Sequence, residues 1–240
     1  MKRSRIAVIG ASGALGSALV NVLGQAEHGN TLYAFSRSPA PFPAENILSG
    51  TIDYEDEMSI AKAAQQASED GKLDMVLVTT GILHSATLWP EKALRDLSAD
   101  NFQKNFLVNT VGPALVAKHF LPLLQRDKRS IFAALSARVG SISDNRLGGW
   151  YAYRASKAAL NMLIKTTSIE LARTRKQAIL VGLHPGTVAS QLSEPFQPRV
   201  PKHKLFTADF SAQQLLSVLN KLTPADSGKV FAWDGSEVPS

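Results

Sequence analysis

The sequence predicts an α/β protein whose parallel, doubly wound sheet carries helices on both faces. Short apolar runs rich in β-branched residues alternate along the chain with longer segments of helical periodicity, which is typical of strand-helix-strand units. Several of the short runs are apolar throughout, as expected for strands that are buried on both faces. The chain has 240 residues, of which 45% are hydrophobic and 19% charged, so we expect residues 1–240 to form one domain with a substantial core.

Strands are expected where a short apolar run is bounded by glycine, proline or polar turn residues. The first, Ile6–Ile9, ends in a glycine-rich turn, and the second, Thr31–Phe35, ends at the sequence Ser-Arg-Ser. In chain order, the remaining strands are expected at Ile47–Asp53, Met75–Thr79, Ser130–Leu135, Ile179–His184 and Lys229–Trp233. Because right-handed crossovers join such strands, they are expected to run parallel.

Helices are expected between the strands, where apolar residues recur at helical spacing. Their expected bounds are Ala14–Gly24, Asp56–Ser68, Ala99–Leu124, Tyr151–Arg173 and Ala208–Leu222. Thr207 is a suitable N-cap for the last helix, since its hydroxyl can accept a hydrogen bond from an N–H group of the first turn. Two loops stand out because loops at the carboxyl ends of parallel strands bind ligands, namely Ser143–Gly149 and the proline-rich Glu194–His203.

Composition excludes several classes of site and partner. The chain has no cysteine, so it holds no disulfide, thiolate metal site or cysteine nucleophile. Its histidines show no spacing typical of metal ligands, and no metal is expected. The net charge of +6 comes from scattered lysines and arginines without interleaved aromatic residues, so no nucleic-acid partner is expected.

The N-terminus has the basic residues and the apolar run of a secretory signal, but the run is interrupted. Glycine and polar residues such as Gly10, Ser12 and Asn21 lie within Ile6–Leu23. No uninterrupted apolar stretch approaches the roughly 20 residues that a membrane span requires. We therefore expect a cytoplasmic protein without a membrane partner.

A glycine-rich turn, GASGALG, follows the first strand and opens the first helix. Gly10, Gly13 and Gly16 would allow a tight turn and let the helix aim its N–H groups at a diphosphate. The same small residues also permit close packing of a helix on a strand without any ligand. Their place between the first strand and the first helix favours a dinucleotide site.

The residues after the second strand indicate which dinucleotide is bound. An acidic side chain at this position would hold the ribose 2′-hydroxyl of NAD, but the sequence reads Ser36-Arg37-Ser38. Arg37 can donate two hydrogen bonds to a 2′-phosphate, which a carboxylate would repel. NADP(H) is therefore the expected cofactor, and the alternative is a plain surface arginine near a turn.

Tyr153 and Lys157 are four residues apart in an expected helix, so their side chains share a face. An ammonium group beside a phenol favours the phenolate and is expected to lower its pKa from the usual value of about 10. Such a pair can exchange a proton with a carbonyl or alcohol oxygen while hydride is transferred. The alternative is a pair of long side chains on an exposed helix.

In this order, the motifs resemble those of the short-chain dehydrogenase/reductase superfamily over nearly the whole chain. Tyr153 and Lys157 match its YxxxK motif, and Asn109 in VNTVGP matches its helix asparagine. Pro185-Gly186 in HPGTVASQLS matches the segment that follows its sixth strand and contacts the nicotinamide end. The stretches GSISDNRLGGWYAYRASKAALNM and GKVFAWDGSEVPS are similar to the C-factor-like branch, which is related to small carbonyl reductases.

The resemblance implies a Rossmann fold, NAD(P)H and reversible chemistry between a carbonyl and an alcohol. It implies that Tyr153 and Lys157 are catalytic and that Asn109 holds a water beside Lys157 and completes a proton relay. The implied contacts to the cofactor are Gly10, Ser12, Gly13, Leu15, Gly16, Ser36, Arg37, Asp53, Gly81, Asn109, Tyr153, Lys157, Pro185, Gly186 and Val188.

The resemblance also implies a homodimer or homotetramer in which the tyrosine helix packs against its counterpart. Small side chains would then permit the close approach of two helices. The alternative is close packing of this helix within its own chain. The small residues in question are Ala152, Ala155, Ser156, Ala158 and Ala159.

The sequence departs from the superfamily pattern at three places. Its glycine motif is GxxGxxG, with Ala14 where classical members carry their second glycine. The stretch Val78-Thr79-Thr80-Gly81 replaces the expected NNAG, so only the glycine survives. The catalytic serine, usually three residues before a glycine, is replaced by Ala137 when the position is counted from Gly140.

A neighbouring serine is expected to replace the missing one. Ser136 is the leading candidate because it is nearest the strand end, although it lies on the opposite side of an extended chain. Ser141 and Ser143 are the alternatives. Without any such donor, lost stabilisation of the developing oxyanion would cost about 3 kcal/mol, roughly a hundredfold in rate.

Two functions are compatible with these motifs. The first is an NADPH-dependent reductase of an apolar aldehyde or ketone, and Trp89, Trp150 and Phe196 either line its substrate pocket or are packed aromatic residues without a function. The second is an NADP(H)-binding sensor or signalling protein with little or no turnover, which Ala137 and the missing asparagines suggest.

Overall fold

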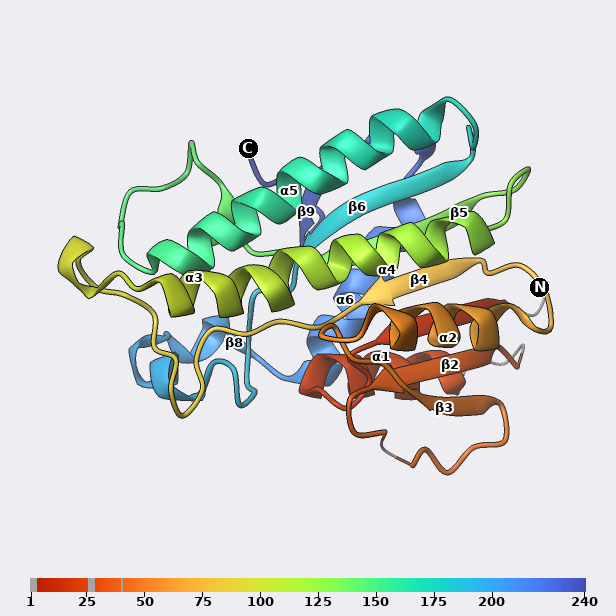
Figure 1. Cartoon of the computed structure of the whole chain (residues 1–240), viewed down its shortest axis with the longest axis horizontal. Helices are drawn as coiled ribbons and strands as arrows, with labels where there is room; N and C mark the ends of the chain where they lie inside the picture. Colours follow the sequence, from red (N-terminus) through yellow and green to blue (C-terminus); the bar gives the residue numbers. More distant parts are fainter. Residues whose placement is uncertain (1–3, 26–28, 40) are drawn as a thin grey trace.

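A parallel sheet forms the centre of the molecule. The computed structural model describes residues 4–25, 29–39 and 41–240, and within them seven parallel strands form one sheet in the order β3-β2-β1-β4-β5-β6-β9 (Figure 1). In chain order the strands are β1 (Arg5–Ile9), β2 (Thr31–Ser36), β3 (Ile47–Thr51), β4 (Met75–Val78), β5 (Ser130–Leu135), β6 (Ala178–His184) and β9 (Val230–Ala232). The doubly wound α/β fold expected from the sequence is confirmed. Its strand order reverses between β1 and β4, where ligands bind in such sheets.

Helices cover both faces of the sheet. Alternate residues of each strand face opposite layers, so Val8 and Leu77 pack against α1 (Ala14–Gly24) and α6 (Ala208–Lys221). Ile9 and Val78 instead join the core under α2 (Glu57–Ser68), α4 (Gly112–Phe120) and α5 (Tyr151–Ala172). Thr207 caps α6 as expected, because its hydroxyl accepts a hydrogen bond from the N–H group of Phe210 at 3.2 Å.

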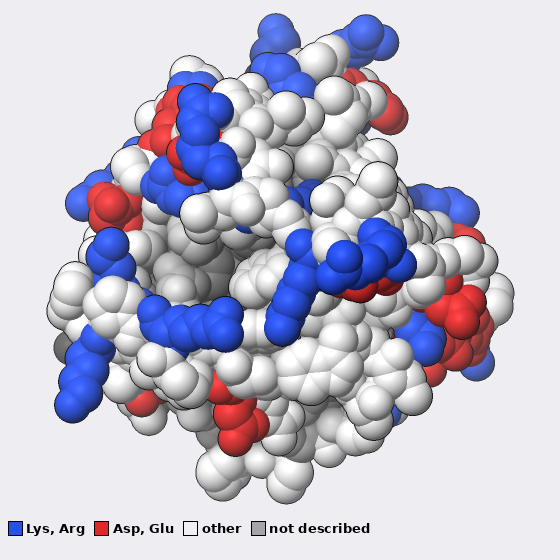
Figure 2. All heavy atoms as spheres, turned by 90° about the vertical axis from the view of Figure 1, so that its left-hand side faces the viewer, with Lys and Arg blue, Asp and Glu red and all other residues white. Residues whose placement is uncertain are grey.

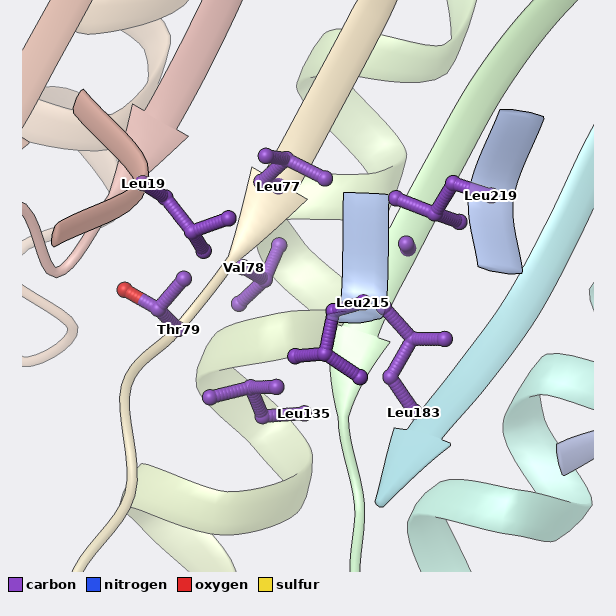
Figure 3. A pocket seen from close by; sticks show the side chains of 9 residues that line it. Leu19, Leu77, Val78, Thr79, Leu135, Leu183, Leu215 and Leu219 are labelled. Carbon is purple, nitrogen blue, oxygen red and sulfur yellow. The ribbon is translucent and has the colours of Figure 1, made fainter. Parts of the chain in front are cut away.

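The layer of α1 and α6 packs closely on the sheet. Figure 3 shows Leu19 of α1 and Leu215 and Leu219 of α6 beside Leu77 and Leu183 of the strands. The cavity that these side chains line has a volume of about 10 Å³. That volume holds at most one water molecule. The apolar layer is therefore a core, and it offers no ligand site.

The helix expected at Ala99–Leu124 is interrupted. It consists of α3 (Ala99–Phe106), the π-helical segment η2 (Leu107–Val111), α4 and the short 3₁₀ turn η3 (Leu121–Leu123). Pro113 has no N–H group to donate to the carbonyl of Asn109, so the regular hydrogen-bond ladder fails at this point. Gly112 is required beside the break, since a Cβ atom there would collide with the ring of Tyr54.

Residues Ala99–Leu123 are also long and apolar enough to cross a membrane by length and composition. In this fold the helix lies against the sheet, and Val116 and Phe120 are fully buried. The ring of Phe120 contacts that of Phe35 on β2, with centroids 6.2 Å apart. Core packing accounts for the apolar character of the helix.

The loops at the carboxyl edge of the sheet contain short regular elements. Between β6 and α6, β7 (Thr187–Val188) pairs with β8 (Leu205–Phe206), and the 3₁₀ turns η5 (Glu194–Arg199) and η6 (Lys202–Lys204) lie between them. Three strands are shorter than expected, because β3 ends at Thr51, β4 ends at Val78 and β9 spans only Val230–Ala232. The polar residues that follow, Asp53 and Thr79, belong to the turns of this edge.

Candidate active site

The glycine-rich turn after β1 forms an open cradle at the start of α1. Gly10 adopts a left-handed conformation, with φ +90°, and a Cβ atom on Gly16 would collide with the Gly10 carbonyl oxygen. Gly13 is the N-cap of α1 and provides no side-chain cap, so the N–H groups of the first turn remain available to an anion. Ser12 is exposed beside them, and Leu15 is buried beneath. The residues present therefore fit a dinucleotide diphosphate.

Threonine replaces the missing asparagines after β4. The hydroxyl of Thr79 donates to the carbonyl of Ile9 at 2.8 Å, and the hydroxyls of Thr80 and the half-buried Tyr54 are hydrogen-bonded at 2.7 Å. These bonds hold the end of β4 against β1 and against the turn between β3 and α2. A Cβ atom on Gly81 would lie 3.6 Å from Asn109 Oδ1 and 3.7 Å from Lys157 Nζ, so Gly81 borders the catalytic candidates.

The residues expected to select the cofactor lie at the ends of β2 and β3. Ser36 is buried and its hydroxyl donates to the Ser38 carbonyl at 2.9 Å, while Arg37 is exposed and has no ion-pair partner among the described residues. Asp53 has a local role, because its carboxylate accepts a hydrogen bond from the N–H group of Glu55 at 3.0 Å. Arg37 is therefore free to meet a phosphate.

Tyr153 and Lys157 lie together on the first turns of α5. Both are buried, with exposed fractions of 8% and 2%, and Lys157 Nζ lies 5.8 Å from the centre of the Tyr153 ring. The same ammonium nitrogen donates to the carbonyl of Leu135, at the end of β5, at 2.9 Å. The predicted pair is therefore placed at the carboxyl edge of the sheet, away from the exposed face of the helix.

Asn109 joins this pair to the neighbouring loop and helix. Its side chain binds the backbone of Ile82 through both groups: Oδ1 accepts from Ile82 N and Nδ2 donates to Ile82 O, each at 2.9 Å. Nδ2 is also 3.1 Å from the hydroxyl of Ser156, which in turn donates to the Tyr153 carbonyl at 2.8 Å. The π-helical segment thus places Asn109 beside α5.

Burial controls the protonation of the two catalytic candidates. It raises the pKa of Tyr153 to about 12 and lowers the pKa of Lys157 to about 7, because a low-dielectric surrounding disfavours both charged forms. The expectation that the ammonium would lower the pKa of Tyr153 is thus wrong for the protein by itself. Loss of solvation outweighs the attraction of a lysine that is itself partly deprotonated near neutral pH.

Ser136, the leading candidate for the missing serine, is hydrogen-bonded to a residue of α5 other than Tyr153 in this structure. It is buried, and its hydroxyl donates to Asn161 Oδ1 at 2.6 Å. Asn161 stands two turns after Tyr153 on α5, about 12 Å farther along the helix axis. The alternation of an extended chain explains the outcome, since Ser136 points toward α5 and Ala137, with φ −152° and ψ 149°, points the other way.

The two alternative serines are used within the loop between β5 and α5. The hydroxyl of Ser141 accepts a hydrogen bond from the N–H group of Asp144 at 3.0 Å. The hydroxyl of Ser143 donates to the carbonyl of Ser240. None of the candidate serines is hydrogen-bonded to Tyr153, so their contacts do not by themselves support the expected substitution.

The segment after β6 is held in place by contacts within the chain. Gly186 has φ +75°, and a Cβ atom there would lie 2.6 Å from the ring of Phe206. The carbonyl of Pro185 accepts a hydrogen bond from Ser211 on α6 at 2.8 Å, and Val188 is buried in β7. These contacts fix the segment that the resemblance assigns to the nicotinamide.

Aromatic side chains from three separate segments meet above Tyr153. The ring of Trp150 lies 6.2 Å from that of Tyr153 and 5.0 Å from that of Phe196, and Trp89 lies 6.5 Å from Phe196. His84 stacks on Trp89 at 5.5 Å and joins this cluster, although its spacing in the sequence had excluded only a metal site. Phe196 of the predicted proline-rich loop therefore meets Trp150, at the start of α5, and Trp89 of the β4–α3 loop in one aromatic cluster beside the phenol.

The carboxyl edge of the sheet is hollowed. Figure 2 shows this face, on which lysine and arginine side chains surround a depression. A basic rim attracts anionic ligands such as a phosphorylated dinucleotide. Within the part of the chain that the structure describes, no group of three or more His, Asp or Glu side chains is arranged to hold a metal ion.

Comparison with known proteins connects this geometry to one family. Residues 4–200 match the family model described as short chain dehydrogenase. C-signal of Myxococcus xanthus is 33% identical over 169 residues, which cover 70% of this chain and 93% of that protein. The 1-hydroxy-2-glutathionyl-2-methyl-3-butene dehydrogenase of Rhodococcus sp. is 32% identical over 186 residues, covering 77% of this chain and 76% of that protein.

Solved structures agree with the fold. The NADPH-bound carbonyl reductase from chicken fatty liver has a TM-score of 0.86 at 25% identity and covers 100% of both chains. The carbonyl reductase Sniffer of D. melanogaster has a TM-score of 0.83 at 24% identity, covering 99% of this chain and 100% of that one. With its YxxxK pair, helix asparagine and parallel sheet in place, this chain belongs to the short-chain dehydrogenase/reductase superfamily of oxidoreductases, in the C-factor-like and carbonyl-reductase-like branch.

Proposed function

We propose that the protein is an NADPH-dependent reductase that converts an apolar aldehyde or ketone into an alcohol. The observation that carries this proposal is the buried pair of Tyr153 and Lys157, with Nζ 5.8 Å from the ring centre, beneath a cluster of aromatic side chains. Aromatic surfaces bind apolar substrates, and a protonated phenol at their base can donate to a carbonyl oxygen. The relatives named as carbonyl reductases support the same class of reaction.

The glycine cradle and Arg37 would hold the cofactor. The first-turn N–H groups of α1 would bind the diphosphate, and the Arg37 guanidinium would bind the 2′-phosphate. When bound, the cofactor supplies the hydride that reduces the carbonyl carbon. The protein's own task is to hold the carbonyl oxygen at Tyr153.

Tyr153 would give its proton to that oxygen as the alcohol forms. Its pKa of about 12 keeps the phenol protonated at neutral pH, as an acid in the reducing direction requires. Lys157 lies within reach to return a proton, and its pKa of about 7 lets it exchange protons with solvent at neutral pH. Asn109 orients the loop at Ile82 and would hold the water that completes the relay.

The experiment is direct. Purified protein is mixed with NADPH and a panel of aromatic and aliphatic aldehydes and ketones, and the nicotinamide absorbance is followed. We expect a loss of absorbance that depends on substrate and is fastest for aromatic carbonyls. A panel without any turnover would contradict the proposal.

Arg37 gives a prediction about cofactor choice. Replacing it with glutamate is expected to lower the ratio of kcat/KM for NADPH over NADH by about a hundredfold, because charge-assisted hydrogen bonds worth about 3 kcal/mol are lost. The control is Arg95→Glu, which makes the same change of charge at a side chain that is 88% exposed on the surface. A ratio that falls equally in both variants would show a general effect of charge instead.

A second copy of the chain is proposed as a partner along α4 and α5. A groove of about 600 Å³ lies between these helices, lined by residues that include Ala114, Leu163 and Ile164. Met162 and Ile169 are 66% and 52% exposed on α5. The small residues are partly explained within the chain, since the buried Ala152 and Ser156 pack beside α3 and η2, while Ala155, Ala158 and Ala159 remain half-buried.

If the chain forms this dimer, a charged substitution in the interface should halve the mass of the particle in solution. Met162→Glu is expected to convert a dimer of the 25.8 kDa chain into a monomer, because the charge would be buried between two apolar faces. Light scattering after size exclusion measures this. Met58→Glu is the matched control, since Met58 is 64% exposed on α2, which is not one of the two helices of the proposed interface. A wild-type protein that is already monomeric would contradict the proposal.

A second function, an NADP(H)-binding sensor without turnover, is favoured by one observation. Ser136 donates to Asn161, and Ala137 offers no hydroxyl in its place. Calorimetry that detects tight NADPH binding, together with an inactive carbonyl panel, would support the sensor. Robust turnover would exclude it.

A further inference from the structure

Glu91 is an unusual residue in this fold. It lies in the loop between β4 and α3, is 3% exposed, and is the one buried carboxylate among residues 4–25, 29–39 and 41–240. A carboxylate removed from water must be compensated by hydrogen bonds or by a positive partner. The hydrogen-bond partners of the Glu91 carboxylate therefore indicate its role.

The carboxylate of Glu91 caps the catalytic helix. Oε2 accepts a hydrogen bond from the N–H group of Ala152 at 3.1 Å, and the Glu91 carbonyl accepts one from Trp150. Trp150 is the N-cap of α5 but supplies no side-chain cap, and it is the one non-glycine residue in the described ranges with a positive φ, 52°. A residue distant in sequence thus does what a capping side chain usually does.

The other carboxylate oxygen opens a ladder of asparagines. Oε1 accepts from Asn101 Nδ2 at 3.2 Å, Asn105 Nδ2 donates to the Asn101 carbonyl at 2.9 Å, and Asn109 Nδ2 donates to Asn105 Oδ1 at 3.2 Å. The three asparagines are spaced by four residues, so they line one face of the helix. From Asn109 the path continues through the Ser156 hydroxyl to the Tyr153 carbonyl.

These contacts form a closed path around Tyr153. The N–H group just before it binds Glu91 directly, and its own carbonyl is reached through the ladder. Trp150, which Glu91 also holds, contacts the Tyr153 ring at 6.2 Å. Glu91 is therefore connected by hydrogen bonds to the backbone on both sides of the Tyr153 side chain.

We propose that Glu91, with Asn101 and Asn105, is a positioning residue that holds Tyr153 in place for proton transfer. The inference rests on the proposed function, because it assigns Glu91 a role in that reaction. A carboxylate suits the place since it accepts from two donors at once, whereas a glutamine would turn an amide donor toward Asn101 or toward Ala152. The positive end of the α5 dipole favours the same charge.

The experiment compares Glu91→Gln, Glu91→Ala and Asn105→Ala with wild-type protein. Turnover of the best carbonyl substrate, NADPH dissociation constants and amide hydrogen exchange at residues 150–154 are measured. Glu91→Ala is expected to lower kcat about 10- to 100-fold, since small misplacement of a catalytic group has effects of this size. The NADPH dissociation constant should change less than about twofold, because the glycine cradle lies at the start of α1.

Hydrogen exchange gives a readout that does not depend on activity. In Glu91→Ala the amide of Ala152 is expected to exchange at least about tenfold faster, because its acceptor is gone. Glu91→Gln keeps one acceptor and should fall between wild type and Glu91→Ala in both kcat and exchange. Asn105→Ala breaks the ladder without touching the helix end, so it should lower kcat while leaving the amide of Ala152 protected.

The matched control is Asp226→Ala. The Asp226 carboxylate also accepts two hydrogen bonds, from the N–H group and the hydroxyl of Thr223, each at 2.9 Å, on the turn that precedes β9 at the opposite edge of the sheet. It should reduce stability without changing kcat. An equal fall of kcat in Asp226→Ala and Glu91→Ala, or unchanged kcat in Glu91→Ala, would overturn the inference.

The experiment distinguishes failure of the proposed reductase function from failure of the positional role of Glu91. Wild-type protein without turnover would overturn the reductase proposal and the catalytic part of this inference together. Unchanged exchange at Ala152 in Glu91→Ala would overturn the positional role even where turnover is present.

Discussion

Replacement of Tyr153 by phenylalanine is expected to lower kcat for carbonyl reduction by about 10²- to 10⁴-fold, the contribution typical of a general acid. The change removes one hydroxyl and keeps the ring that contacts Trp150 at 6.2 Å. Its effect is therefore chemical, since the phenol that burial keeps protonated is lost. Stopped-flow or steady-state measurement of NADPH oxidation tests it.

The control for this variant is cofactor binding. The dissociation constant of NADPH, followed by nicotinamide fluorescence, should stay within about twofold of the wild-type value because the diphosphate cradle lies on α1. Equal turnover in Tyr153→Phe and wild type would assign the proton to another group. Lost NADPH binding would instead indicate a structural defect.

Replacement of Ala137 by serine is expected to raise kcat by about a hundredfold. The new hydroxyl would stand at the family position, on the side of the chain opposite Ser136, and could donate to the developing oxyanion, a contribution worth about 3 kcal/mol. An extended backbone with φ −152° and ψ 149° accommodates the serine without strain. The same NADPH oxidation assay measures the gain.

Ser136→Ala is the comparison for that variant. Its hydroxyl is committed to Asn161 at 2.6 Å, so its removal should leave kcat nearly unchanged and only weaken the contact between β5 and α5. A large loss of kcat in Ser136→Ala, with no gain in Ala137→Ser, would contradict this assignment. It would mean that the backbone at residues 136–137 changes conformation when substrate binds, so that Ser136 faces the substrate.

Local patterns were sufficient to predict the sheet and the proximity of Tyr153 and Lys157. Strands that are buried on both faces need apolar residues throughout, so apolar runs predicted their positions. The four-residue spacing of Tyr153 and Lys157 predicted that their side chains share one face of a helix. Asn109 was found through its resemblance to a family motif. The implied contacts of Pro185, Gly186 and Arg37 to a cofactor remain predictions.

Tertiary contacts explain what the sequence did not reveal. Burial raises the pKa of Tyr153, and the spacing of residues in the sequence does not show which side chains are buried. Glu91 looks like an ordinary loop acid until Ala152 is seen to donate to it. A signal existed in two places: Pro113 marked the weakness of the long helix, and the repeat of Asn101 and Asn105 before Asn109 marked a polar face.

The π-helical segment also sets the rotational phase of the long helix. Val116 and Phe120 follow Asn109 by seven and eleven residues, a spacing that would put all three on one side of an uninterrupted α-helix. The wider turn at Leu107–Val111 rotates the preceding part by roughly a quarter turn, so the amides meet α5 while the Phe120 ring enters the apolar layer. Deleting one residue from this stretch would make the helix regular and would turn the asparagine side chains toward the apolar layer. The more regular helix would therefore give a less stable protein.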